Sequence, residues 1–162
     1  MLHRTISLTV IASIALTLAF SGCASMTERT DRVRTVFVND VKIRVSLPPE
    51  GNERTGIAVD FLTVHNAELA AKLMETDAKT WFSAKNQFKN DYTAGKDFDI
   101  EEREYAPGSF VRPVELPWRS RRTVLLIYAD YRSPGPHRFR ANQRQELILT
   151  LGEKEFSVVP KN

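Results

Sequence analysis

The sequence predicts a mainly β protein, namely an antiparallel β-sandwich of seven to eight strands with a helical insertion after the second strand. Three observations predict this fold. From residue 41 to the C-terminus, short apolar segments are separated by Pro and Gly residues that form turns. The first of these segments alternates apolar and polar residues, as half-buried strands do. Between residues 66 and 90 the apolar residues instead recur every three or four positions, which is typical of helices.

The N-terminal segment has the three parts of a secretory signal. A short basic start precedes an apolar run over residues 6–20, and small residues then lead into Cys23, the only cysteine of the chain. A helix needs about 20 apolar residues to cross a bilayer, so this run is too short for a membrane span. We therefore expect residues 1–22 to be a cleaved signal peptide.

The string AFSGC, which ends at Cys23, resembles the lipobox of bacterial lipoproteins. The resemblance implies that Cys23 becomes the first residue of the mature chain, and that acyl chains such as palmitate hold it on a membrane. Ala24 stands where an aspartate would indicate retention in the inner membrane, which implies the periplasmic face of the outer membrane. The alternative is an ordinary signal peptide and a free cysteine, although a lone exposed thiol is a liability in an oxidising compartment.

The mature chain has room for one domain, since removing residues 1–22 from the 162-residue sequence leaves 140 residues. Residues 24–34 are polar and charged and have no periodicity. We therefore expect residues 23–35 to form the lipidated N-terminus and a tether. Residues 36–162 are expected to form the β-sandwich domain in the periplasm.

The domain is expected to begin with two strands of different kinds. Residues 41–47 alternate apolar and polar side chains and predict a half-buried strand. The stretch PPEGNERTG, residues 48–56, then predicts a long exposed connection. Residues 57–64 are apolar on both faces except for Asp60, which predicts a strand in the middle of a sheet.

Two helices are expected after the second strand. Asn66 is a suitable N-cap for a helix through residue 74, and Thr76 or Asp77 can cap a second helix. Trp81 and Phe82 fall on the apolar face of the second helix, so we expect both in the core. Lys85 lies within the same face, and we expect its amine to extend outward to solvent.

Five further strands are expected over residues 97–105, 110–116, 123–131, 146–151 and 155–159. The first is highly charged and suits the edge of a sheet, where charge discourages aggregation. Pro113 favours an edge position for the second. The third is the most hydrophobic and is expected to be buried. The last two form a hairpin around Gly152 and Glu153.

Basic residues are concentrated between residues 112 and 144, where eight arginines face only Glu115 and Asp130. The residues expected to form a basic contact face are Arg132, His137, Arg138 and Arg140. Such a face is suited to an acidic partner, lipid headgroups or lipopolysaccharide phosphates, and the alternative is an ordinary solvated face. The mature chain has 22 Lys and Arg against 20 Asp and Glu, which is too balanced to predict nucleic acid binding.

The residue types that carry catalysis are scarce in the mature chain. His65 and His137 are its only histidines, and the chain has no second cysteine, no paired metal-ligand motif, no glycine-rich phosphate loop and no Gly-x-Ser-x-Gly elbow. We therefore expect no enzymatic activity, no metal, no cofactor and no small-molecule substrate. His65 is expected to pack or to form a hydrogen bond next to the helix, and His137 to be a candidate for partner contact.

The order of the segments resembles the outer-membrane lipoprotein of the type VI secretion system membrane complex. The segments that carry the resemblance are IAVDFLTVH, LAAKLMETDAKTWF, EREYAPGSFVRPVELP, RRTVLLIYADYRSPGPHRFR and ELILTLGEKEFSVVP. The resemblance implies a transthyretin-like β-sandwich with an added helical element. It also implies a structural role, in which the domain binds the periplasmic domain of an inner-membrane subunit of the secretion complex.

In that family the connection between the first two strands is implicated in partner contact, which here corresponds to residues 48–56. The residues implied to bind the partner are Glu50, Asn52, Glu53 and Arg54. Two other kinds of function stay open at this point. The chain could be a pilotin-like lipoprotein that escorts a secretin, or a module that binds envelope lipid or polysaccharide through its arginine face.

Overall fold

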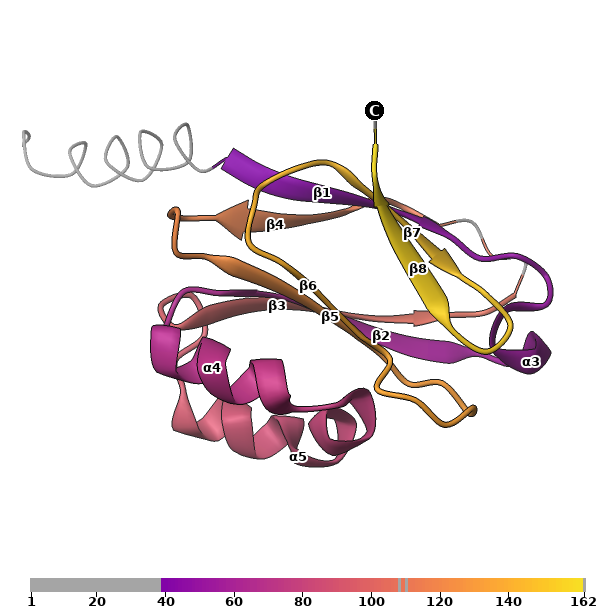
Figure 1. The fold of residues 1–162 in the computed structure, drawn as a ribbon, viewed down its shortest axis with the longest axis horizontal. Coiled ribbons are helices and arrows are strands. Elements are labelled where there is room, and N and C mark those ends of the chain that lie inside the picture. The colour runs from indigo at the N-terminus through magenta and orange to yellow at the C-terminus, as the bar shows by residue number, and fades with distance from the viewer. Residues whose placement is uncertain (1–38, 108, 110, 162) are drawn as a thin grey trace, which may run out of the picture. The chain divides into compact units, whose positions relative to one another are not determined.

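The computed structural model describes residues 39–107, 109 and 111–161 (Figure 1). The strands are β1 (Asn39–Ser46), β2 (Ile57–Val64), β3 (Phe98–Tyr105), β4 (Val114–Trp118), β5 (Val124–Ala129), β6 (Arg138–Ala141), β7 (Leu147–Leu151) and β8 (Phe156–Pro160). The helices are α3 (Gly51–Arg54), α4 (Ala67–Glu75) and α5 (Ala78–Asp91). The expected signal peptide, Cys23 and the tether lie outside the described residues and stay predictions.

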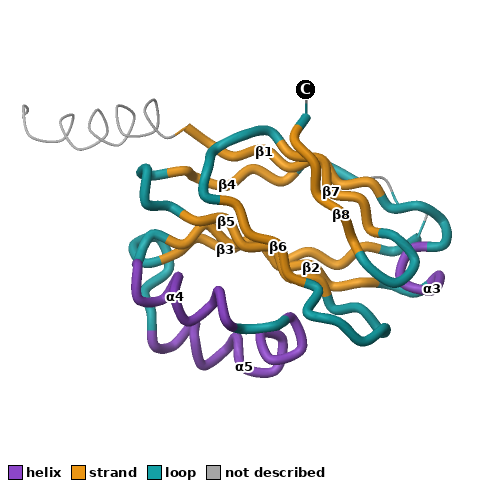
Figure 2. The backbone as a smooth tube through the Cα atoms, viewed as in Figure 1, coloured by secondary structure: helices purple, strands orange, loops and turns teal. Residues whose placement is uncertain are grey.

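The strands form two four-stranded sheets that face each other as a sandwich (Figures 1 and 2). Sheet A has the order β4-β1-β7-β8, and sheet B has the order β3-β2-β5-β6. Neighbouring strands are antiparallel except for β1 and β7, which are parallel, so the prediction of an entirely antiparallel sandwich is wrong at this pair. The many residues between β1 and β7 allow the chain to return in the same direction, which a short hairpin does not.

One apolar cluster fills the space between the two sheets. Val41 and Ile43 of β1 belong to it together with Val59 and Phe61 of β2, and each of these side chains is at most 1% exposed. Arg44 of β1 is exposed on the other face. β1 is therefore the half-buried strand that its alternation predicts.

Helices α4 and α5 cover the outer face of sheet B and form a second apolar cluster with it (Figure 1). Trp81 of α5 is 1% exposed and stacks on Tyr128 of β5, with ring centroids 5.1 Å apart. The Tyr128 hydroxyl donates a hydrogen bond of 2.6 Å to the carbonyl oxygen of Leu73 in α4. Since sheet B is covered on both faces, β2 and β5 are apolar on both faces and do not alternate. Phe82 is only half-buried, so its predicted core position is only partly right.

Both helices begin at the predicted N-caps. The Asn66 side chain accepts hydrogen bonds from the backbone N–H groups of Glu68 and Leu69, at 2.9 and 3.1 Å. Asp77 accepts one from the N–H of Thr80 at 2.7 Å. These side chains satisfy backbone donors that have no partner within the first turn of a helix.

Lys85 does not extend to solvent as predicted. Its Nζ lies 2.9 Å from Oδ2 of Asp60, a β2 carboxylate with a side chain only 2% exposed, and 2.7 Å from Oε1 of Glu102 in β3. The indole Nε1 of Trp81 donates to the same Asp60 oxygen at 2.8 Å. A buried carboxylate is costly unless it is paired and hydrogen-bonded, and α5 supplies both partners.

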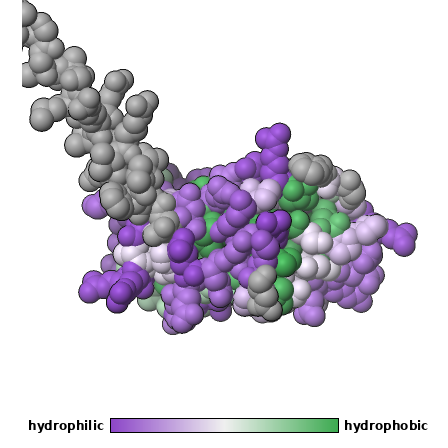
Figure 3. All heavy atoms as spheres, turned by 90° about the horizontal axis from the view of Figure 1, so that it is seen from above, coloured by the Kyte–Doolittle hydropathy of each residue, from purple (hydrophilic) through white to green (hydrophobic). Residues whose placement is uncertain are grey.

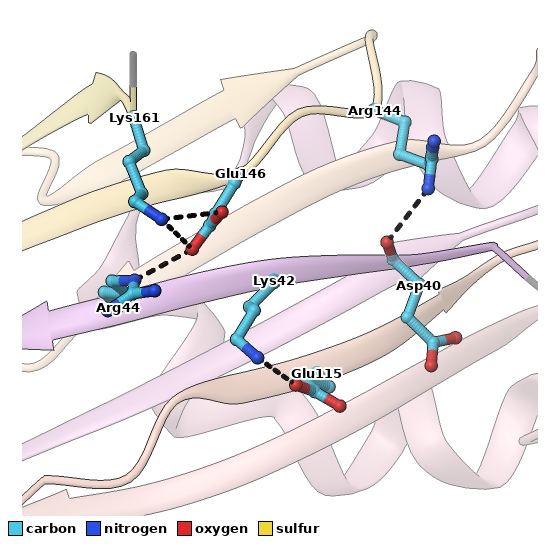
Figure 4. Close-up of polar contacts among 7 residues, drawn as sticks. All are labelled: Asp40, Lys42, Arg44, Glu115, Arg144, Glu146 and Lys161. Atoms are coloured by element: carbon cyan, nitrogen blue, oxygen red, sulfur yellow. Dashed lines mark hydrogen bonds and ion pairs between the residues drawn. The ribbon is translucent and has the colours of Figure 1, made fainter.

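The outer face of sheet A is largely hydrophilic (Figure 3). Ion pairs cross its strands: Nζ of Lys42 lies 2.7 Å from Oε1 of Glu115, and Nε of Arg44 lies 2.8 Å from Oε1 of Glu146 (Figure 4). Lys161 also contacts Glu146, at 3.1 Å. The two sheets therefore differ, because one carries helices and the other carries charged side chains on its outer face.

One strand was not predicted, and another begins later than predicted. β6 was not predicted, because its sequence RFRA is short and charged and follows a Pro- and Gly-rich segment. Its backbone pairs with β5, with Ala141 opposite Leu125 and Arg138 opposite Tyr128. β4 begins at Val114 rather than at residue 110, since Pro113 has no N–H group to donate to a neighbouring strand. The predicted edge positions of the strand before Pro107 and of β4 are confirmed, because β3 and β4 each lie at the edge of a sheet.

Candidate functional site

The connection between β1 and β2 is folded against a neighbouring turn rather than extended into solvent. The backbone N–H of Asn52 donates to the carbonyl oxygen of Gly152 at 3.0 Å, and that of Glu53 donates to Glu153 at 3.1 Å. Gly51 is buried next to the same turn. The prediction of a long exposed connection over residues 48–56 is therefore wrong for its middle part.

Asn52 is buried, which corrects its predicted position at the exposed tip of the connection. It is 1% exposed. Its side-chain amide donates to the carbonyl oxygen of Gly56 at 2.8 Å and to Oγ1 of Thr55 at 3.0 Å. Its side-chain oxygen accepts from the backbone N–H of Arg132 at 3.1 Å, which links this connection to the one between β5 and β6.

Three successive residues of the connection have a left-handed backbone: Asn52, Glu53 and Arg54 have φ values of 47°, 55° and 63°. Such a run is costly for residues other than glycine, and it persists only where the surroundings hold it. The hydrogen bonds of the Asn52 side chain stabilise this backbone conformation. Glu50, Glu53 and Arg54 remain exposed, so three of the four predicted partner-binding residues lie on the surface.

The connection between β5 and β6 completes this end of the sandwich. The Tyr131 hydroxyl donates to the carbonyl oxygen of Gly152 at 3.2 Å, and the Ser133 hydroxyl donates to that of Lys154. Residues 48–56, 130–137 and 152–155 thus form one hydrogen-bonded unit, called the three-loop end below. That these three segments form one unit was not predicted, because no local pattern shows that distant turns share hydrogen bonds.

Two hollows lie beside the β5–β6 connection. One, of about 480 Å³, is lined in part by Asp77, Tyr131, Arg132 and His137. The other, of about 650 Å³, is lined in part by His137, Arg138, Phe139, Lys154, Phe156 and Val158. Both are open surface features with mixed polar and apolar walls. Their residues come mainly from the three-loop end, from the start of α5 and from the edge strands β6 and β8.

The predicted basic face is partly used inside the molecule. Nη1 of Arg138 donates to the carbonyl oxygen of Thr76 at 2.8 Å, next to the C-terminus of α4. Nε2 of His137 donates to the carbonyl oxygen of Ser133 at 2.8 Å, and its ring packs against Tyr131. Arg132 and Arg140 are exposed. Two of the four predicted contact residues therefore already have intramolecular partners.

His65 lies in a row of polar groups at the opposite end of the sandwich. Its Nδ1 is 3.0 Å from Oγ1 of Thr123, and its Nε2 is 2.8 Å from Oδ2 of Asp99. Arg119 holds the same carboxylate with two hydrogen bonds, at 2.9 and 3.0 Å. A hydroxyl, an imidazole and a carboxylate in line are also the parts of a nucleophilic triad.

Thr123 cannot reach a substrate, because it has no exposed surface and its Oγ1 accepts from the backbone N–H of Ser120 at 3.2 Å. Neither hollow described above includes it. His65 is thus held by hydrogen bonds on both ring nitrogens, in agreement with the predicted hydrogen bonding of this residue. Burial raises the pKa of Asp99, but hydrogen bonds from Arg119 and His65 outweigh it, so the pKa lies below its usual value.

No protein-family model matches the sequence, and no curated protein matches it. Solved structures do match. The T6SS lipoprotein TssJ1 from Pseudomonas aeruginosa is 17% identical with a TM-score of 0.56, and the match covers 77% of this chain and 98% of TssJ1. Serratia marcescens Lip, a membrane-bound component of the type VI secretion system, is 14% identical with a TM-score of 0.55, over 76% of this chain and 98% of Lip. The domain has the fold of type VI secretion lipoproteins.

A third match is to a chain in the structure of the T6SS protein TssM C-terminal domain (869-1107) from EAEC. It is 13% identical with a TM-score of 0.50, and it covers 75% of this chain and 97% of the matched chain. At sequence identities of 13–17%, these matches show similarity of fold alone. The resemblance that the order of segments predicts is thus confirmed at the level of the type VI lipoprotein fold.

Two further features of this type VI lipoprotein fold concern chemistry and membranes. Within residues 39–107, 109 and 111–161, no group of three or more His, Cys, Asp or Glu side chains is arranged to hold a metal ion. Over the same residues, no helix has the length and apolar character that crossing a bilayer requires.

We predict that Asp99→Asn lowers the free energy of unfolding at neutral pH and that this difference shrinks in acid. The pKa of Asp99 is lower in the folded state than its unfolded value of about 3.9, so its contribution is fully present above that pH and is lost as the pH falls through the folded pKa. Urea denaturation of the wild-type protein and of Asp99→Asn between pH 7 and pH 3 measures this difference in the free energy of unfolding. A difference that stays constant down to pH 3 contradicts the assignment.

Proposed function

We propose that this chain is a lipid-anchored structural component of a type VI-like secretion membrane complex, and that its domain binds the periplasmic domain of an inner-membrane subunit. One observation carries the proposal: the fold matches two type VI secretion lipoproteins over 98% of each of their chains. The predicted lipid on Cys23 would hold the domain at the periplasmic face of the outer membrane. The secretion partner then has to reach the domain from the other membrane.

We place the partner contact at the three-loop end. Glu50, Glu53 and Arg54 are exposed there, above a backbone that is fixed by Asn52 and by the β7–β8 turn. A segment that is already ordered loses little conformational freedom on binding, so more of its contact energy appears as affinity. The left-handed backbone of Glu53 and Arg54 is a second indication, because strained conformations cluster at functional sites.

We predict that exchanging the charges of Glu53 and Arg54, with Glu53→Lys and Arg54→Glu, breaks the complex without unfolding the domain. The exchange keeps the net charge and leaves Asn52 in place. Tagged protein is isolated from detergent-solubilised envelopes, and the inner-membrane subunit is quantified. The exchange of Glu75→Lys with Lys79→Glu is the matched control, because both residues are exposed on the helical side of the domain. Equal recovery of the subunit with both variants contradicts the proposed contact.

A further inference from the structure

The two ends of the sandwich carry opposite charge in their connections. At the end where β1 begins, the connections are residues 65–66, 92–97, 119–123 and 142–146. Their charged residues are Lys96, Arg119, Arg121, Arg122 and Arg144 against Asp97 and Glu146, an excess of three positive charges. At the other end, residues 47–56, 106–113, 130–137 and 152–155 carry Arg54, Arg112, Arg132 and Lys154 against Glu50, Glu53, Asp130, Glu153 and Glu155, an excess of one negative charge.

Four of the basic residues at the first end are exposed and form no ion pair within the described part of the chain. They are Lys96, Arg121, Arg122 and Arg144, called the basic end below. Arg119 differs from them, because its Nε lies 2.9 Å from Oδ2 of Asp99. The two acidic residues of these connections are also engaged, whereas Asp40, the second residue of β1, is exposed. Glu146 contacts Arg44 and Lys161, and Asp97 accepts hydrogen bonds from Thr93 and Asn66.

Strand register brings the basic end together. In sheet B, Phe98 and Val124 both pair with Val64. Lys96 stands two residues before Phe98, and Arg122 stands two residues before Val124. In sheet A, Asn39 pairs with Trp118, and the turn with Arg121 follows directly.

The β6–β7 connection returns to the same place. Its Arg144 lies beside the start of β1, with Nη1 at 3.5 Å from the carbonyl oxygen of Asp40 (Figure 4). The basic residues therefore lie at the end of the sandwich at which β1 begins.

The chain before β1 limits how far this end can lie from the predicted anchor. Fifteen residues separate Cys23 from Asn39. A fully extended chain spans about 3.3–3.6 Å per residue, so the basic end stays within roughly 55 Å of the lipidated residue. A short tether also raises the effective concentration of the membrane surface to the millimolar range, so weak contacts suffice.

We propose that the basic end binds the phosphate groups of anionic phospholipid headgroups in the leaflet that holds Cys23, and that this contact turns the three-loop end away from the membrane. The inference rests on the proposed lipid anchor and gives the proposed partner contact its orientation. Guanidinium groups suit phosphate because their planar donors can bind two oxygens at once. At about 1 kcal/mol for each arginine near an anionic surface, or roughly five-fold each, three arginines change the ratio of oriented to unoriented domains on the order of 100-fold.

The orientation is measured with the mature lipidated protein in vesicles that contain an energy-acceptor lipid. A donor dye is placed on Asn142→Cys at the basic end or on Glu153→Cys at the three-loop end, two exposed positions at opposite ends of the sandwich. We expect stronger energy transfer from the first dye than from the second in phosphatidylcholine vesicles that contain phosphatidylglycerol. The difference should disappear in pure phosphatidylcholine and at high salt, which screens surface charges.

Two triple variants test the assignment at equal net charge. Arg121→Gln, Arg122→Gln and Arg144→Gln together should abolish the difference between the two dyes. Arg54→Gln, Arg112→Gln and Arg132→Gln together remove the same charge from the opposite end and should preserve it. A persistent difference in the first variant, its loss in the second, or equal transfer from both dyes in the wild-type protein overturns the proposal. Because no secretion subunit is present, the result is independent of the proposed partner contact.

Discussion

Replacing Trp81 by alanine is expected to lower the free energy of unfolding by about 3–5 kcal/mol, as for other large buried aromatic residues. The indole is 1% exposed, stacks on Tyr128 and Phe88, and donates to the buried carboxylate of Asp60. Its removal leaves a cavity between α5 and sheet B and takes one of two partners from Asp60. Such a loss is a large share of the stability of a domain of this size.

Two companion variants separate the contributions to this effect. Trp81→Phe keeps most of the packing but removes the N–H donor, so it should cost less than alanine. Phe82→Ala should also cost less, because Phe82 is only half-buried. Chemical denaturation followed by circular dichroism measures all three. An unchanged midpoint for Trp81→Ala would show that α5 does not pack on the sheet as described.

Replacing Asn52 by alanine is expected to cost about 2–4 kcal/mol, although the residue lies in a connection. A buried polar group that loses its partner costs about 1–3 kcal/mol. The variant removes the hydrogen-bond partner of both the N–H of Arg132 and the carbonyl oxygen of Gly56. Alanine also tolerates the left-handed backbone at φ 47° poorly. The same denaturation measurement gives the difference from the wild-type protein.

Asn52→Gly distinguishes the two causes. Glycine accepts the left-handed backbone but forms none of the side-chain hydrogen bonds, so this variant should lose less stability than Asn52→Ala. If Asn52→Ala is as stable as the wild-type protein, the three-loop end is not held by this side chain. If the glycine variant is the less stable of the two, the backbone conformation has been misjudged.

The sequence predicted those parts of the fold in which local pattern and tertiary environment agree. The alternation of β1, the two caps at Asn66 and Asp77, and the unbroken apolar run of β5 all correspond to the structure. In each case the signal lies within about ten residues. The charged strand β3 also lies at an edge, as its composition predicts.

The errors occur where distant residues decide the outcome. Lys85 was expected to reach solvent, but its amine donates a hydrogen bond to the buried carboxylate of Asp60, which lies 25 positions away in the sequence. Asn52 was expected at an exposed tip, but it is enclosed by Gly152 and Arg132, which come from two later connections. β6 depends on pairing with β5 and not on its own sequence. Hydrogen bonds of this kind have no local signature.

The same difference limits the candidate site. The residue types at the three-loop end suggest an exposed polar connection, and three of its four predicted residues are indeed exposed. The hydrogen bonds that link residues 48–56 to the β5–β6 and β7–β8 connections follow only from the fold. The eight arginines between residues 112 and 144 look like one group in the sequence, but the strands separate Arg121, Arg122 and Arg144 from Arg132 and place them at opposite ends.

Calorimetric titration of the protein with the periplasmic domain of the inner-membrane subunit tests the proposed contact most directly. The Glu53→Lys, Arg54→Glu variant is compared with a variant of the arginine face, Arg140→Glu, which changes an exposed residue and keeps the hydrogen bond from Arg138 to the carbonyl oxygen of Thr76. Contact through the three-loop end predicts that the first variant binds on the order of ten-fold more weakly or worse, as expected for a central interface residue, while the second binds like the wild-type protein. Normal affinity in the first variant and lost affinity in the second would contradict it.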